Sequence, residues 1–347
     1  MSMSRGLALT LVLVFLTASF LIVLAVNPVH AVGVVTNTVR VGNEPEGLAY
    51  DPAKSEIFVA NAYSSSISVI SDINNSVVAT ISLPSSPSSI VYDSAKSEIF
   101  ASNYVSPGVV YVISDVNNSL VATVPVGASV MALVYDSVKG EIFATNFANS
   151  TVSVISDITN TVVATIPVGY DPSGIAYDSS NGEILVTDLI ITDNHTRVPN
   201  SITIISDSNN TVVANVFAGY GDGGLAYDSA LGEIFAVSCN NASVSVISDS
   251  ANSVVATVPV GYNCYDVAYD SGKGEIFVTN HGSANAVSVI SDSNNSLISY
   301  LTIPNPSGIV YDSGKGEILI SDWSAGTVSI ISDSTILPPS TSPLPTP

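Results

Sequence analysis

The sequence predicts an all-β protein: a seven-bladed β-propeller of four-stranded antiparallel blades, closed by a strand from the N-terminal segment. Two repeated phrases carry this prediction. Tyr-Asp pairs recur every 42 or 43 residues, with one interval of 50, and Ile-Ser-Asp recurs seven times in step with them. The Tyr-Asp pairs begin at Tyr50, Tyr92, Tyr135, Tyr177, Tyr227, Tyr269 and Tyr311. Short apolar runs between turns at this period are typical of propeller blades.

One repeat shows the four strands of a blade. Residues 173–178 and 183–188 are short apolar runs, 201–207 alternates, and 211–219 is rich in β-branched residues. Such residues favour a pleated, half-buried surface. No stretch of 32–333 has good helical periodicity, so we expect strands throughout.

The Tyr-Asp fragment itself is interpreted as a hairpin turn. Its Asp ends the first strand of a blade, a Glu begins the second, and four residues lie between them. Asp favours the start of a type I turn, and Gly suits a left-handed position at the turn's end. Gly fills that last place in five copies and Ser in two. Repeated equally in every blade, the fragment indicates folding chemistry rather than one active site.

The two ends of the repeat region predict how the ring closes. The seventh repeat stops at Asp333 without a fourth strand, whereas Gly33–Gly42 matches the fourth-strand phrase Asn160–Gly169. We therefore expect Val34–Val41 to supply the outer strand of the last blade, which would remove two open sheet edges.

These repeats resemble those of the YVTN family of β-propeller proteins. Both the fourth-strand phrase NTVVATIPVG and variants of the namesake tetrapeptide at the end of the second strand are present. The variants are Phe58–Asn61, Phe143–Asn146, Leu185–Asp188 and Phe277–Asn280. The resemblance covers about residues 33–333. It implies an exported, surface-layer type of protein, and relatives of the fold include lactonases, lyases and dehydrogenases.

The segments that flank the propeller predict where the protein is located. Residues 1–31 combine a short, weakly basic start, an apolar run and small residues before a cut after Ala31. This pattern predicts a cleaved export signal, with an uncleaved N-terminal anchor as the alternative. Residues 334–347 form a Pro/Ser/Thr-rich tail or linker that lacks the apolar run of a membrane anchor. In either case the propeller of residues 32–333 is expected to be secreted or displayed at the cell surface.

Composition excludes several partners. Only 11% of the residues are charged and the formal net charge is -21, so no basic surface is available for nucleic acid. The same charge disfavours contact of the propeller with anionic membranes. The two cysteines have no zinc-site spacing. Both map to the top face at neighbouring blades, so an oxidising compartment favours a disulfide between Cys239 and Cys264, with two free buried thiols as the alternative.

Alternating strand direction sorts the turns onto two faces. The turns after Tyr-Asp and Ile-Ser-Asp define the bottom face, and the loops after the second and fourth strands define the top face. The repeated motifs put 21 of the 29 acidic residues at the bottom, and the other eight map to the top. We expect the bottom face to be a solvated acidic rim. The alternative is a face that collects cations.

Seven sequons accompany the export signal, which is consistent with a glycoprotein if the host glycosylates. Asn and Ser are also good turn residues, so the sequons have an equally ordinary structural explanation. The sequon asparagines are Asn74, Asn117, Asn149, Asn194, Asn209, Asn241 and Asn294.

Candidate ligand-binding residues are those that depart from the repeat, and all lie on the top face. Loops 189–200, 280–286 and 321–326 differ most from their counterparts. Acids and a histidine converging on a propeller mouth could bind a small polar ligand or a divalent cation. Ordinary loop polarity is the competing explanation, because no close metal-ligand spacing occurs. The candidates are Glu46, Asp171, Asp222, Asp266, His281 and Trp323.

From these observations we expect an exported, non-enzymatic binding or surface-layer module of the cell envelope, with an envelope protein or glycan as partner. The alternative is a metal-assisted, lactonase-like or lyase-like enzyme at the top mouth. A purely structural layer subunit is a third possibility. No catalytic residue and no cofactor beyond a possible divalent cation is predicted, and the oligomeric state is left open.

Overall fold

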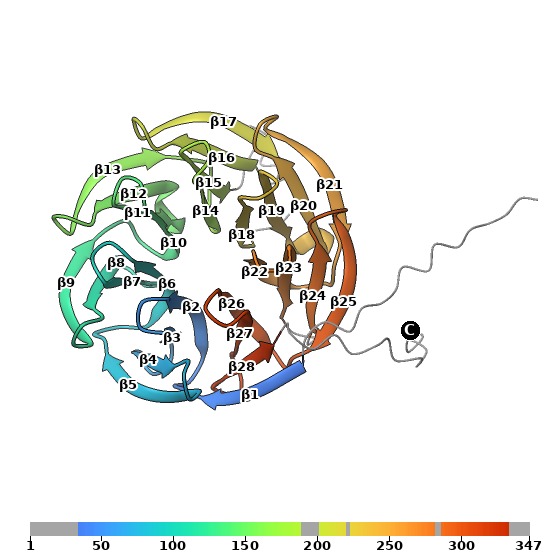
Figure 1. Ribbon diagram of the computed structural model, residues 1–347. Coiled ribbons are helices and arrows are strands. Elements are labelled where there is room, and N and C mark those ends of the chain that lie inside the picture. Colours follow the sequence, from blue (N-terminus) through green and yellow to red (C-terminus); the bar gives the residue numbers. More distant parts are fainter. Residues whose placement is uncertain (1–33, 189–200, 220–222, 282–285, 333–347) are drawn as a thin grey trace, which may run out of the picture.

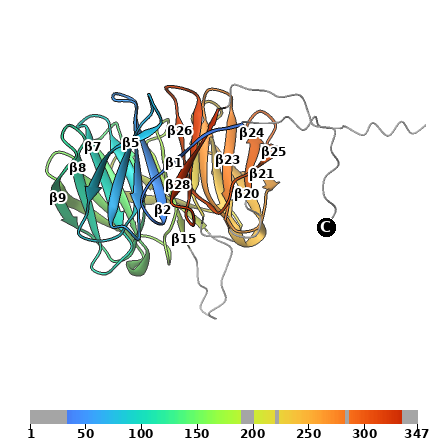
Figure 2. The same ribbon diagram turned by 90° about the horizontal axis from the view of Figure 1, so that it is seen from below.

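The computed structural model describes residues 34–188, 201–219, 223–281 and 286–332. These residues form seven four-stranded antiparallel sheets arranged as blades around a central axis (Figure 1). Seen from the side, the strands run between two opposite faces, where the turns gather (Figure 2). The predicted seven-bladed propeller is confirmed. The predicted export segment 1–31 and the tail 334–347 lie outside the described residues.

Each blade contains four strands in sequence order from the axis outwards, except blade seven, where the N-terminal strand is outermost. The innermost strands are β2 (Pro45–Asp51), β6 (Pro87–Asp93), β10 (Val130–Asp136), β14 (Ile175–Asp178), β18 (Leu225–Asp228), β22 (Cys264–Asp270) and β26 (Pro306–Asp312). The second strands are β3 (Glu56–Asn61), β7 (Glu98–Asn103), β11 (Glu141–Asn146), β15 (Glu183–Asp188), β19 (Glu233–Ser238), β23 (Glu275–Asn280) and β27 (Glu317–Asp322).

The third strand of each blade is largely buried, whereas exposed side chains gather on the outermost strand. The third strands are β4 (Ser66–Ser71), β8 (Val109–Ser114), β12 (Thr151–Ser156), β16 (Ser201–Ser206), β20 (Ser243–Ser248), β24 (Ala286–Ser291) and β28 (Thr327–Ser332). The outermost strands are β5 (Ser76–Ser82), β9 (Ser119–Pro125), β13 (Thr161–Pro167), β17 (Thr211–Phe217), β21 (Ser253–Pro259), β25 (Ser296–Thr302) and β1 (Val34–Arg40). Two single-turn helices on the top face are η1 (Phe147–Asn149) and η2 (Cys239–Asn241).

The Tyr-Asp turns have the local chemistry that the sequence predicts. In blade three, Asp136 is fully buried, and its Oδ1 accepts the backbone N–H groups of Val138 at 2.9 Å and Lys139 at 3.1 Å. Gly140 closes the turn at a φ of 67°. Only glycine adopts this left-handed conformation without strain, whereas the two copies with Ser carry a small penalty there.

Strand β1 closes the ring beside β28, as the sequence predicts (Figure 1). Val34 lies opposite Ser332 and Arg40 opposite Thr327, so the two strands pair along almost their whole length. Val39 of β1 is 6% exposed and packs in an apolar cluster shared by blades seven and one. This one strand therefore joins the beginning of the propeller to its end.

The hydrophobic core lies between blades rather than inside one sheet. Each cluster of buried side chains combines residues from two neighbouring blades, as when Phe58 and Ile67 of blade one pack with Ile90 and Ile99 of blade two. Stacking neighbours in this way buries both faces of every sheet. No blade can bury its apolar surface alone.

Hydroxyl groups at the top face tie neighbouring blades together. The Thr279 hydroxyl at the end of β23 donates to the carbonyl of Ser307 in the next blade at 2.8 Å. Ser321 makes the equivalent bond to the carbonyl of Glu46 at 2.8 Å, and Thr145 bonds Ser173 at 3.0 Å. These bonds fix the starts of the inner strands, which surround the axis.

We predict that ring closure by β1 stabilises the whole propeller. Val39→Asp buries an unpaired charge in the closing cluster, so it should lower the free energy of unfolding by roughly 2–4 kcal/mol. Val35→Asp is the matched control, because Val35 belongs to the same strand but is 43% exposed. Removing residues 1–43 should abolish cooperative unfolding, whereas removing 1–31 should not. Equal denaturant unfolding curves for the two truncated chains would contradict closure by this strand.

Candidate functional site

The same two inner-strand positions of every blade meet at the top of the axis. In β2 they are Glu46 and Gly47, and in β22 they are Tyr265 and Asp266. The other five blades carry small residues, apart from one methionine. Their pairs are Ser88–Ser89, Met131–Ala132, Ser173–Gly174, Gly223–Gly224 and Ser307–Gly308. Blades one and six therefore depart from the repeat at its most central point.

Crowding around the axis explains the small residues. A Cβ atom at Gly47 would lie only 2.7 Å from the carbonyl oxygen of Ser88 in the next blade. Asp266 fits at the equivalent position of blade six because its neighbour across the blade boundary is Gly224. A Cβ at Gly224 would lie 2.6 Å from the Asp266 Oδ1 atom. The missing side chain of one blade therefore makes room for the carboxylate of the next.

A pocket of about 270 Å³ opens among these residues at the top face. It is lined by Glu46, Gly47, Ser88, Ser89, Tyr104, Met131, Ala132, Ser173, Gly174, Gly223, Gly224, Tyr265, Asp266 and Gly308. We name it the mouth pocket. Along the axis beneath it lies a second cavity of about 160 Å³ with a largely polar surface, lined by Leu48, Ile90, Leu133, Ile175 and Leu225 together with Asp266 and the small residues that precede them.

Glu46 contributes an uncompensated carboxylate to the mouth pocket. Ser321 of blade seven holds its backbone carbonyl, while its side chain faces the pocket. Water reaches the carboxylate, but protein atoms surround it because the pocket is concave. Burial, followed by the nearby charge of Glu44, raises the pKa of Glu46 to about 7. Close to neutral pH this group can therefore hold or release a proton.

Asp266 is held more firmly than Glu46. Its Oδ1 accepts the N–H of Val267 at 2.9 Å, and its Oδ2 accepts the N–H of Ile309 in blade seven at 3.2 Å. Ser89 makes the same kind of bond in blade two, accepting the N–H of Leu133 at 3.1 Å. Asp266 is thus an inter-blade bridge that also carries a charge. Burial raises its pKa to about 6, although the two N–H groups partly offset the effect.

Aromatic side chains lie at the top of the pocket, on the same side as Glu46 and Asp266. Tyr265 lines the pocket, and its ring centroid lies 6.3 Å from that of His281. His281 in turn lies 6.2 Å from Trp323, edge to face. His281 and Trp323 directly follow β23 and β27 and repeat the same backbone bond, to Asn263 at 2.7 Å and to Asn305 at 3.2 Å. These three side chains form an arc across blades six and seven, which we name the aromatic arc.

The structure brings some of the predicted site residues together and separates others. Glu46 and Asp266 both line the mouth pocket, and His281 and Trp323 reach it through Tyr265. Asp171 is not among the lining residues. It occupies a loop position with a φ of 50°, where its role is to turn the chain. Asp222 lies outside the described residues.

Sequence reasoning missed Tyr265 and Tyr104, which also line the pocket. The sequence does contain a signal that Tyr265 belongs to the site. It immediately precedes Asp266 and stands where four of the other blades have serine or glycine. Tyr104 directly follows β7, as Trp323 follows β27. Comparing equivalent positions across all seven repeats would have found both.

The two cysteines are neighbours on the top face, as the sequence predicts, and the structure holds both as thiols. The Cys239 thiol contacts the backbone carbonyl of Cys264, and both belong to the cluster between blades five and six. The disulfide between them stays a prediction.

Six of the seven sequon asparagines are exposed, and Asn194 lies outside the described residues. Several have a turn role as well. The Oδ1 of Asn74 accepts the hydroxyl of Ser76 at 2.7 Å, and Asn117 accepts that of Ser119 at 2.7 Å. Exposure makes them suitable acceptors, while the turn bonds explain why Asn is present without any glycan.

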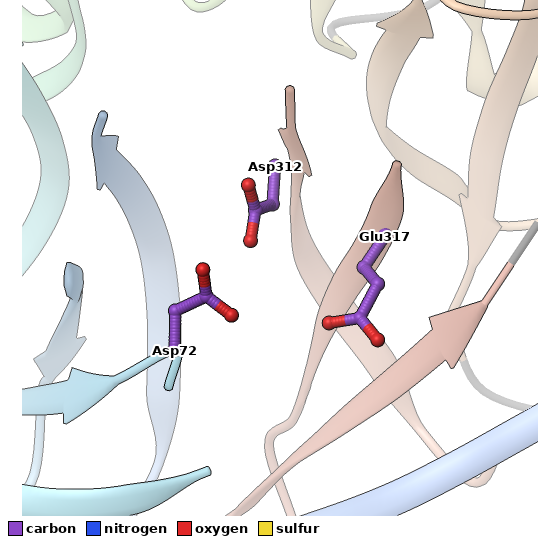
Figure 3. A group of neighbouring side chains, drawn as sticks. All are labelled: Asp72, Asp312 and Glu317. Atoms are coloured by element: carbon purple, nitrogen blue, oxygen red, sulfur yellow. The ribbon is translucent and has the colours of Figure 1, made fainter. Parts of the chain in front are cut away.

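The repeated acids of the bottom face serve the junctions between blades. At the junction of blades seven and one, ligand atoms of Asp72, Asp312 and Glu317 lie within 4.8 Å of one another. Asp72 and Asp312 point toward each other from different blades (Figure 3). Lys315 already forms an ion pair with Asp72, and at the next junction Lys54 lies 3.3 Å from Asp115. The protein therefore supplies its own cations at these junctions.

We predict that the propeller is more stable in mild acid than at neutral pH. Folding raises the pKa of Glu46 from 4.5 to about 7 and that of Asp266 from 3.8 to about 6. Burial also raises the pKa of five bottom-face glutamates: Glu56, Glu98, Glu141, Glu183 and Glu233. The folded chain keeps these protons where the unfolded chain has lost them, so stability falls as pH rises through the raised values.

Thermal melts should therefore give a melting temperature at about pH 8 that is about 2 °C or more below the value at about pH 5. The double variant Glu46→Ser, Asp266→Ser should show a smaller difference. A melting temperature that rises with pH over this range would show that other groups dominate.

We also predict that the secreted protein contains the Cys239–Cys264 disulfide. A bond that closes this loop would contribute roughly 3 kcal/mol by the chain-entropy estimate. Thiol counting in denaturant, with and without a reductant, measures the outcome. Two titratable thiols before reduction would rule the bond out.

Comparisons with known proteins agree with the fold and leave the function open. A model of the NHL repeat matches residues 170–196, which include β14 and β15 of blade four. The hydrazine synthase of Kuenenia stuttgartiensis has a similar fold, with a TM-score of 0.74 and 13% sequence identity over 84% of this chain and 96% of that one. Because 1713 chains of solved structures match, the fold alone selects no activity. A search of curated proteins found no match. The chain is thus a seven-bladed β-propeller in which residues 170–196 are similar to the NHL repeat, and the narrower YVTN assignment stays an expectation from the sequence.

Proposed function

We propose that this protein is an exported, non-enzymatic binding module of the cell envelope that holds a small ligand in the mouth pocket. The observation that carries this proposal is the convergence of Glu46, Tyr265 and Asp266 on one pocket. These residues depart from the repeat at positions where the other blades have mostly small side chains. A ligand must be recognised by residues that meet at one point, and only the axis brings different blades together.

Export and display at the cell surface rest on the sequence of residues 1–31 and on the exposed sequons. Among the described residues, no helix is long and apolar enough to cross a membrane. An envelope protein or glycan is the partner that this location favours, and the YVTN resemblance supports the same setting. The bottom face, which the sequence predicts to be a solvated acidic rim, instead has most of its repeated aspartates buried at the blade junctions, and we assign it no ligand.

A metal-assisted hydrolytic enzyme remains the second candidate, because the pKa of Glu46 near 7 suits a general acid or base. The carboxylates of Glu46 and Asp266 are the groups that would hold a divalent cation in the mouth pocket. Among the residues that the structure describes, however, the pocket does not gather three metal-ligating side chains; the bottom-face group does. Binding without catalysis therefore fits the pocket better.

A thermal-shift screen tests the proposal. The protein is melted with divalent cations, mono- and disaccharides, organic amines and organic acids, because a ligand that prefers the native state raises the melting temperature. Ligands that stabilise the protein should bind at least about tenfold more weakly to the double variant Glu46→Ser, Asp266→Ser. Serine is chosen because it stands at the equivalent position of Glu46 in three blades and of Asp266 in one.

Asp171→Asn is the matched control. It removes a top-face charge outside the lining of the pocket. Asn263 and Asn305 occupy the equivalent left-handed position, with φ values of 56° and 37° against 50° for Asp171. Retained binding in the serine double variant, together with loss in the bottom-face variant Asp270→Asn, would show that the site has been assigned to the wrong face. Turnover of a metal-dependent ester or lactone substrate that is lost in the serine variant would favour the enzyme.

A further inference from the structure

The mouth pocket has two chemically different sides. Its polar side consists of Glu46 and Asp266, together with Tyr265 and the aromatic arc above it. The opposite side, from blades two to five, is made of small residues, Met131 and Tyr104. A ligand therefore meets carboxylates on one side only and aromatic rings on both sides.

The charge on the polar side lacks a positive partner within the pocket. Among the described residues that line the pocket, none is Lys, Arg or His. The two oxygens of Asp266 each accept one backbone N–H, whereas no hydrogen bond from a described residue offsets the burial of Glu46. A ligand that brings a positive charge would offset the desolvation of these carboxylates.

Aromatic surface lies next to the charge. Tyr265 is 45% exposed, and its hydroxyl is held by the side chain of Ser307, which fixes the ring beside the pocket. Cations attached to carbon are attracted to the faces of such rings. Trp323, which is 38% exposed, extends the aromatic arc at the top face.

Size and polarity argue for an organic cation rather than a metal ion. The pocket of about 270 Å³ is far larger than a bare ion, and most of the surface that lines it is apolar. Two carboxylates, one of them already hydrogen-bonded twice, supply few of the six to eight oxygen ligands that calcium requires. Methyl or methylene groups suit the apolar walls, and a positive head group suits the acids.

We propose that the mouth pocket binds a small organic cation of the alkylammonium class. Its nitrogen faces the carboxylates of the pocket, and its carbon groups lie against Tyr265 and Met131. This inference rests on the proposed binding function and specifies its ligand. The same chemistry occurs in free quaternary or primary amines and in the lysine side chain of a protein.

Matched probe pairs test the proposal by calorimetry on the full chain. Choline is compared with its neutral carbon isostere dimethylbutanol, and pentylamine with pentanol. A blocked peptide with one central lysine is compared with the same peptide containing norleucine. At least one charged member should bind about tenfold or more tightly than its neutral partner. Preference for choline and pentylamine identifies a free amine, whereas preference for the lysine peptide identifies a protein ligand.

The variants connect that preference to the pocket. Glu46→Ser and Asp266→Ser should each weaken binding of the charged probe by about tenfold, and Tyr265→Leu should do so more strongly for choline than for pentylamine. Asp171→Asn should bind as the unchanged protein does. Melting curves confirm that each variant folds, and Asp266→Ser retains a hydroxyl for the inter-blade bond that Ser89 makes in blade two.

Equal binding of charged and neutral probes would overturn the organic-cation inference. So would a sugar or a divalent cation that binds alone and is lost in the serine variants, although that outcome would leave the binding function intact. Failure of every class of ligand in the thermal-shift screen and in calorimetry would reject the binding function and this inference together.

Discussion

The narrow space around the propeller axis is the constraint on which the rest of the structure depends. Seven inner strands converge there, and a side chain at Gly47 would collide with the carbonyl of Ser88 in the next blade. Small residues at this position let the blades approach, and close approach lets their apolar faces pack. Asp266 violates the rule and is accommodated by Gly224 beside it. Glycine also occupies this position in blades one, four and seven, so Gly224 follows the repeat, and Asp266 is the departure that marks the centre of the candidate site.

Local chemistry explains what the sequence could predict. The turn at Asp136 was predictable because an Asp that accepts two N–H groups and a glycine with positive φ act within a few residues. Glu46 and Asp266 were also predictable, since repeat positions at the starts of inner strands must meet at the axis. Asp171 was not, because its backbone turns away in a left-handed conformation that composition does not reveal. The pairing of Tyr265 with His281 depends on contact between an inner strand and a loop, which spacing along the chain does not report.

The two faces use the same kind of side chain for different ends. Bottom-face carboxylates are repeated in every blade, and several have a lysine beside them, as Asp115 has Lys54. Lysines offset part of their charge, as Lys315 does at Asp72, and their positions are dictated by turns. Glu46 and Asp266 occur once each, and the described residues that line their pocket include no lysine or arginine. Acidity alone would not have separated the two sets, whereas repetition and the presence of a local counter-charge do.

The pairing of β1 with β28 has a mechanical consequence. Because the strands are antiparallel and Val34 lies opposite Ser332, the chain enters and leaves the propeller at the same end of one strand pair. Hydrogen bonds between antiparallel strands lie perpendicular to the strand direction. Tension applied through the chain on either side of the propeller would load these bonds one after another, beginning at Val34, rather than all at once in shear. The pairing of β1 with β28 would therefore separate one hydrogen bond at a time under tension. It would open at a low force, beginning at the end where the chain is held.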